Sequence, residues 1–269
     1  MRLTSFVISE GRGREVSQDQ AIQTIKTKCK KALSLYLKDG DTLLRGLNGG
    51  KDFMHVAPKT SMPRESAYTD NYYTLILDND PRWKSFPKRS QSIVCSTDFY
   101  KAKVYGTSYR VFSYDGSRYG VCPKDDIWYS FKETFGMPLG TVNGELNMLG
   151  ELCDVDIGDT KTYSDLVKYL NEIDKKIVEI LKQTETEYYD DDMEALNDND
   201  LFKKWNSNIS FTKWFLDQFD PQKNDFYVTT DISKVFSTGV KSKEVWTDGE
   251  SVLINYHLSE YEMKELLTK

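Results

Sequence analysis

Three short stretches of this 269-residue chain each place a polar residue at the end of an apolar run. Arg45 follows two leucines in LLRG, Ser96 and Thr97 end SIVCST, and Glu244 precedes Val and Trp in KEVW. Short apolar runs bounded by Gly, Asn or Ser are typical of buried strands. An arginine at the end of such a strand requires an anion, because an unpaired buried charge is costly. The first question is therefore which anion Arg45 meets.

Each of these residues also has a purely structural explanation. Arg45 can pair with a carboxylate of the core, Ser96–Asp98 can cap a helix, and Glu244 can be one of many surface acids. Considered one at a time, the stretches leave these explanations open.

Together, the three stretches resemble the ADP-ribosyltransferases of the Arg–Ser–Glu class. Leu44-Arg45-Gly46 matches the first motif of that family, Ser96-Thr97-Asp98 matches its Ser-Thr-Ser motif, and Glu244 matches its late glutamate at a strand start. The chain is also similar to a family of tailed-phage proteins of this type. That similarity is carried by PRES at Pro63–Ser66, FPKRSQSIVCST at Phe86–Thr97 and KAKVYGTSYRVFSY at Lys101–Tyr114, and covers roughly 41–114 and 225–256.

The resemblance implies NAD as co-substrate and a reaction that cleaves its nicotinamide–ribose bond. Positive charge develops on the ribose during this cleavage, as in glycoside hydrolysis, and a nearby carboxylate stabilises it. Glu244 is the expected carboxylate, with Ser96 holding it by a hydrogen bond. Arg45 is expected to bind the NAD phosphates and to line an open cleft. The other expected cofactor-binding residues are Gly46, Thr97, Phe99, Tyr100 and Arg89.

Two positions depart from the family pattern. Ser242 stands where many members have Glu or Gln for engaging the acceptor, and Asp98 replaces the third residue of Ser-Thr-Ser. Glu145 in VNGELNML is a second candidate for the catalytic glutamate. We expect a macromolecular acceptor, protein or nucleic acid, in the cytoplasm of a host cell. The alternatives are an NAD glycohydrolase, and a non-catalytic phage module that binds a partner through the acidic run Glu185–Asp200.

Composition argues against several classes of function. The net charge of −6 argues against general coating of nucleic acid, although Pro81–Arg110 holds seven basic residues and one acid. The four cysteines are widely spaced and His55 and His257 are the only histidines, so we expect reduced thiols and no metal site. The N-terminal MRLTSFVISEGRGR has no long apolar core, and no apolar run approaches a membrane span, so we expect neither signal peptide nor membrane helix.

The expected fold is a single α+β domain, 1–269. The resemblance implies a split β-sandwich of two small antiparallel sheets, with an N-terminal helix and a helical insertion at about 123–224. Patterning predicts helices at Ser17–Asp39, in 98–106 and 125–135, and at Thr162–Thr184 and Phe211–Phe219. It predicts strands at Thr42–Leu47, 92–96, 109–114, 119–123, 225–229, 243–246 and 251–258, with a TDG turn joining the last two. Asn48–Ser66 and Glu185–Asp200 are predicted loops, and Ala67–Leu77 is ambiguous.

Overall fold

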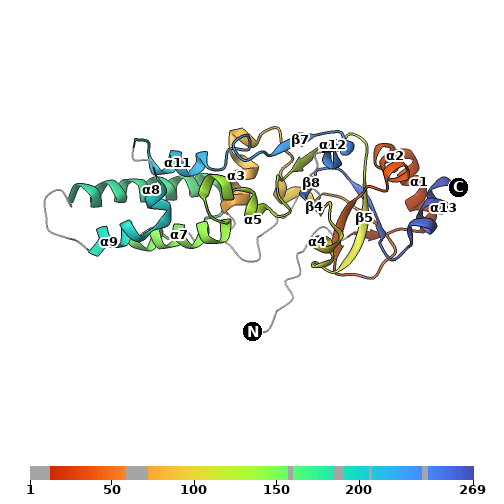
Figure 1. Ribbon diagram of the computed structural model, residues 1–269, viewed down its shortest axis with the longest axis horizontal. Coiled ribbons are helices and arrows are strands. Elements are labelled where there is room, and N and C mark those ends of the chain that lie inside the picture. Colours follow the sequence, from red (N-terminus) through yellow and green to blue (C-terminus); the bar gives the residue numbers. More distant parts are fainter. Residues whose placement is uncertain (1–12, 59–71, 157–159, 184–190, 206–207, 238–241) are drawn as a thin grey trace. The chain divides into compact units, whose positions relative to one another are not determined.

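The computed structural model describes residues 13–58, 72–156, 160–183, 191–205, 208–237 and 242–269 (Figure 1). The chain divides into two compact units. Unit 1 comprises 1–65, 85–127 and 225–269, and unit 2 comprises 66–84 and 128–224. The described residues form an α+β protein with 13 α-helices and one nine-stranded antiparallel sheet, whose strands all belong to unit 1.

The sheet has the order β1-β3-β9-β5-β2-β4-β8-β6-β7. Strand pairing is weakest in the middle of the sheet, where β2 and β4 share one registered pair, Leu44↔Ser96, whereas β2 and β5 share five. The first five strands in that order therefore hold together well, as do the last four, with a weak junction between them. The strands are β1 (Arg14–Glu15), β2 (Leu43–Leu47), β3 (Phe53–Val56), β4 (Ile93–Ser96), β5 (Thr107–Ser113), β6 (Tyr119–Val121), β7 (Tyr227–Thr229), β8 (Glu244–Thr247) and β9 (Ser251–Asn255).

The predicted helix Ser17–Asp39 is two helices, α1 (Gln18–Lys28) and α2 (Lys30–Asp39), so the prediction of one continuous helix was wrong. Its ends are confirmed: Ser17 and Gln20 form a capping box, and Gly40 closes α2 in the left-handed conformation. The break at Cys29 has a distant cause. The Asp115 carboxylate accepts hydrogen bonds from the backbone N–H groups of Lys30 and Lys31, at 3.2 and 2.9 Å, and so caps a new helix.

Four further helices belong to unit 1 or begin in it: α4 (Phe99–Lys103), α5 (Ile127–Ser130), α12 (Ile232–Phe236) and α13 (Glu260–Thr268). A short 3-10 helix, η2 (Arg89–Gln91), leads into β4. Figure 1 shows α1, α2 and α13 gathered at one end of this unit. Their apolar side chains join those of the sheet in one core that includes Ile25, Leu43, Val111, Leu253 and Leu267. This core fixes β2, β5 and β9, on which the candidate site depends.

Unit 2 is helical and built around aromatic side chains. Rings of Phe131, Phe135, Phe215 and Phe219 lie 4.9–5.6 Å apart between centroids, and the Trp83 indole donates to the Phe219 carbonyl at 2.9 Å. The long amphipathic α8 (Tyr163–Gln183) confirms the predicted helix over its described part. The other helices are α3 (Tyr72–Asn79), α6 (Lys132–Phe135), α7 (Leu139–Leu152), α9 (Asp191–Asp198), α10 (Asp200–Lys204), α11 (Phe211–Asp217) and the 3-10 helix η1 (Pro81–Trp83).

Three local predictions need correction. The predicted loop Asn48–Ser66 contains β3, which pairs with β9 and β1, and its residues 59–66 lie outside the described ranges. The predicted acidic loop is helical over α9, where Leu196 is fully buried, and 185–190 again lie outside the description. The TDG turn joins strands that are not neighbours, since β8 pairs with β4 and β6 whereas β9 pairs with β3 and β5.

Gly120 leaves room for the Trp246 indole on the neighbouring strand. A Cβ at Gly120 would lie 2.2 Å from the buried Trp246 ring, whose N–H donates to the Pro87 carbonyl at 2.7 Å. We expect Gly120→Ala to reduce the free energy of unfolding by about 1–3 kcal/mol, because the ring must shift in a filled core. Urea denaturation measures the change. The control is Gly49→Ala, an exposed position with only an ordinary 3.8 Å contact; equal losses for the two variants would contradict this account.

Candidate functional site

The three motif stretches lie side by side in unit 1. The register pairs Leu44 with Ser96 on β2 and β4, and Ser96 with Glu244 on β4 and β8. Residues paired in this way point to the same face of a sheet. Segments distant in the sequence therefore place a hydroxyl and a carboxylate next to each other, at the thin junction of the sheet.

Glu244 is held by an arginine. One of its carboxylate oxygens, Oε1, accepts from Nε and Nη2 of Arg89 at 3.1 and 2.7 Å, and Oε2 accepts from the Ile127 backbone N–H at 3.4 Å. The two side chains are only 12% and 5% exposed, so they form a buried ion pair. The expected role of Arg89 on a phosphate is untested, but the structure brings it directly to the predicted catalytic carboxylate.

Ser96 and its neighbours organise the turn after β4. The Ser96 hydroxyl accepts from the Asp98 backbone N–H at 3.0 Å, in place of the expected bond to Glu244. Asp98 in turn caps α4, accepting from the N–H groups of Tyr100 and Lys101. The Thr97 hydroxyl accepts from the Lys243 N–H at 2.9 Å, which ties this turn to the start of β8. The capping explanation is thus confirmed for Asp98.

Arg45 is buried, so the expectation that it lines an open cleft is wrong. Its side chain is 5% exposed, and Nη1 donates to the Val94 carbonyl at 2.7 Å. The cause lies in the junction between β2 and β4, because the two strands do not pair beyond Leu44↔Ser96. The Arg45 guanidinium therefore donates to a β4 carbonyl that would otherwise accept from the backbone of a neighbouring strand.

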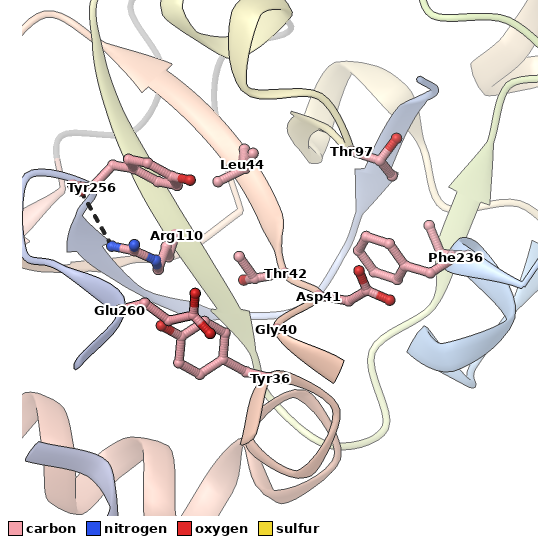
Figure 2. Close-up of a pocket in the computed structure, with 11 residues that line it drawn as sticks. Tyr36, Gly40, Asp41, Thr42, Leu44, Thr97, Arg110, Phe236, Tyr256 and Glu260 are labelled. Carbon is pink, nitrogen blue, oxygen red and sulfur yellow. Dashed lines mark hydrogen bonds between the residues drawn. The ribbon is translucent and has the colours of Figure 1, made fainter. Parts of the chain in front are cut away.

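A pocket of about 330 Å³ opens beside these segments, lined by Leu44 and Thr97, the chain neighbours of Arg45 and Ser96 (Figure 2). Its other walls include Tyr36, Asp41, Arg110 and Glu260. Sequence reasoning singled out none of these four for a site. The only available signal was the polar pair Asp41-Thr42 before an apolar strand, because the remaining residues reach the pocket through pairing and helix packing.

Phe99 and Tyr100 lie on α4, at the edge of this region. The Phe99 ring contacts Tyr256, a residue of the pocket wall, with centroids 4.5 Å apart, whereas the Tyr100 side chain is 78% exposed. Gly46 meets α4 itself: a Cβ there would lie 2.0 Å from the Ala102 carbonyl oxygen. Close packing of helix on strand therefore requires this glycine.

Several sequence candidates have other surroundings. Glu145 lies in unit 2, where its carboxylate accepts from the Asp200 N–H at 2.8 Å at the start of α10. In the basic segment, Arg82 pairs with Asp80, while Arg89 and Arg110 are buried, so its arginines do not form an exposed cationic face. All four cysteines are buried.

Among the described residues, no cluster of three His, Cys, Asp or Glu side chains is placed to hold a metal ion. In the same ranges, no helix combines the length and apolar character needed to cross a membrane. Comparisons of the chain with protein-family models, curated proteins and solved structures give no match.

Proposed function

We propose that this protein is an NAD-dependent mono-ADP-ribosyltransferase that transfers ADP-ribose to a macromolecular acceptor and releases nicotinamide. The observation that supports this most is the row Leu44, Ser96 and Glu244 on three neighbouring strands. It brings together the strands that carry the Arg, Ser and Glu motifs, with Ser96 and Glu244 on one face of the sheet and the Arg45 side chain on the other. The weak β2–β4 junction also suits the split β-sandwich expected for such an enzyme, with NAD bound where its two halves part.

Glu244 would stabilise the positive charge that develops on the ribose as the bond to nicotinamide breaks. For this its carboxylate must face the substrate, and in the structure it faces Arg89. The NAD pyrophosphate carries more negative charge than the Glu244 carboxylate and can compete with it for the planar guanidinium of Arg89. Arg89 would then exchange Glu244 for a phosphate, so that substrate binding frees the carboxylate.

A non-catalytic binding module on the same scaffold is the second candidate. It is favoured by the same ion pair, because a protein that only binds a partner needs no accessible carboxylate at Glu244. NAD hydrolysis would use the same residues as transfer, with water as the acceptor, and is distinguished by its products.

The test is incubation of the purified protein with bacterial lysate and NAD labelled in its adenylate part. We expect label in macromolecules and free nicotinamide, and a fall of about 10²–10³-fold for Glu244→Gln, the scale of losing one electrostatic stabiliser of a transition state. Nicotinamide release without incorporated label would indicate a glycohydrolase.

The matched control is Glu250→Gln, which removes a charge from a carboxylate that bonds His55 at 2.9 Å elsewhere in unit 1. We expect it to retain wild-type transfer. If the wild type neither transfers label nor releases nicotinamide, the enzymatic proposal is refuted and the binding module remains.

A further inference from the structure

A lysine is buried directly before Glu244, the glutamate to which the proposed function assigns catalysis. Lys243 is only 1% exposed. Burial lowers its pKa, because the ammonium group loses its hydration there. Lysines are rarely buried to this extent, and an apolar side chain would avoid the cost. The stability of the core therefore does not explain a lysine at this position, and its contacts must.

The ammonium group of Lys243 is anchored on α12. Nζ donates at 2.9 Å to the carbonyl of Val235, which lies in the last turn of α12 and eight residues earlier in the chain. Carbonyls of a last helical turn have no partner within the helix, so a lysine side chain can satisfy them. Val235 and Ile232 are buried in the core of unit 1, which makes α12 a firm anchor. The Tyr227 ring adds a second contact, with its centroid 5.8 Å from Nζ.

The backbone of Lys243 is bonded in both directions to the turn after β4. Its N–H donates to the Thr97 hydroxyl at 2.9 Å, and its carbonyl accepts from the Thr97 N–H at 3.1 Å. The next residue, Glu244, donates its N–H to the Lys124 carbonyl at 3.1 Å and is the first residue of β8, opposite Ser96. Lys243 therefore links α12, the turn after β4 and the start of β8.

We propose that Lys243 is a positioning residue for Glu244. Its side-chain bond to α12 and its backbone bonds to Thr97 hold the start of β8, and so fix where the Glu244 carboxylate lies. The end of a strand opens readily when its anchoring contacts are lost. A displacement of about 1 Å at a catalytic group can slow a reaction by about 10²-fold. The inference rests on the proposed function only for the catalytic role of Glu244.

Backbone hydrogen exchange of Lys243→Met tests the positioning without any reaction. Methionine keeps the apolar stem of the lysine and removes the hydrogen bond to Val235. We expect the amide protons of Thr97 and Glu244 to exchange about 10-fold faster than in the wild type, and that of Val111 in β5 to exchange no faster. Equal acceleration at all three amides would show a global loss of stability, and no acceleration would show that the side chain holds nothing in place. Either result overturns the inference.

Lys203→Met is the matched control. The Lys203 Nζ also donates to a backbone carbonyl at 2.9 Å, that of Asp198, but its side chain is 51% exposed and it lies in unit 2. This variant should leave exchange at Thr97 and Glu244 at the wild-type rate. Acceleration there equal to that in Lys243→Met would contradict a specific role for Lys243.

Should Lys243→Met fail to fold in urea denaturation, two variants of Thr97 test the same contacts. Thr97→Val removes the hydroxyl that accepts from the Lys243 N–H, so exchange at Glu244 should be about 10-fold faster. Thr97→Ser keeps the hydroxyl and should restore the wild-type rate. Equal rates at Glu244 in the two variants would overturn the inference.

Transfer kinetics connect the positioning with the reaction. In Lys243→Met we expect kcat to fall about 10-fold or more without a rise in the KM for NAD, because a displaced Glu244 weakens the transition state and not substrate binding. Lys203→Met should transfer label like the wild type. If the wild type transfers no label but exchange accelerates locally, the proposed enzyme fails and the positioning stands. If the wild type transfers label and Lys243→Met has the same kcat, the enzyme stands and the positioning role is overturned.

Discussion

Arg89→Gln is expected to reduce the free energy of unfolding by about 3–5 kcal/mol, because it leaves the Glu244 carboxylate buried without its cation. The pair is short, at 2.7 Å, and both side chains are almost completely covered. Burial has already removed the hydration of both charges, so the loss includes the cost of desolvating the carboxylate that is left behind. Urea denaturation of the wild type and the variant measures the difference.

The chain offers a matched exposed pair. Arg118 and Asp248 meet at 2.8 Å with side chains 45% and 32% exposed, so Arg118→Gln should cost no more than about 1 kcal/mol. In a double-mutant cycle, the variant with both Arg89→Gln and Glu244→Gln should lose less unfolding free energy than the sum of the losses in the two single variants. Equal losses for Arg89→Gln and Arg118→Gln would show that the Arg89–Glu244 pair contributes no more than a surface contact.

The same pair bears on function. If Glu244 is catalytic, its carboxylate reaches the substrate only when a ligand displaces Arg89. If Arg89 only anchors Glu244, NAD affinity should be unchanged in a folded Arg89→Lys variant. If Arg89 exchanges Glu244 for a phosphate, the loss of its planar fork should weaken NAD binding.

Local signals in the sequence were sufficient for several elements. Ser17 and Gln20 correctly predicted the start of α1, and the apolar stripe from Leu166 to Leu181 correctly predicted α8. Both signals are local, because a cap and an apolar stripe depend only on residues within one or two helical turns of each other. The break at Cys29 could not be predicted in this way. It depends on Asp115, which follows β5 and is 85 residues further along the chain than Lys30.

The candidate site shows the same division. The residue types at Ser96 and Glu244 correctly indicated the end of β4 and the start of β8, and the register places these two residues opposite each other, whereas Arg45 lies in the middle of β2. The sequence did not reveal that Arg89 pairs with Glu244 or that Arg45 is buried, because side-chain partners across a sheet depend on where two strands part. The walls of the pocket were missed for a related reason, since Tyr36 and Arg110 meet only through packing of α2 against β5.

Gly46→Ala is expected to cost at least about 3 kcal/mol of unfolding free energy, toward the upper end for overpacked sites. The new Cβ would lie 2.0 Å from the Ala102 carbonyl oxygen and 2.9 Å from the Tyr105 Cβ. A backbone carbonyl cannot rotate away as a side chain can, so α4 as a whole must move. Gly50→Ala, exposed and with open space around it, is the control and should change stability by less than about 1 kcal/mol.

The result separates two roles for this glycine. If Gly46 serves mainly to let α4 pack on β2, the alanine variant should lose stability first. If Gly46 serves mainly to admit the nicotinamide of NAD, the variant should keep wild-type stability and lose only NAD affinity. A variant with wild-type stability would contradict the packing role, because a methyl group at position 46 would lie 2.0 Å from the Ala102 carbonyl oxygen and cannot fit unless α4 moves.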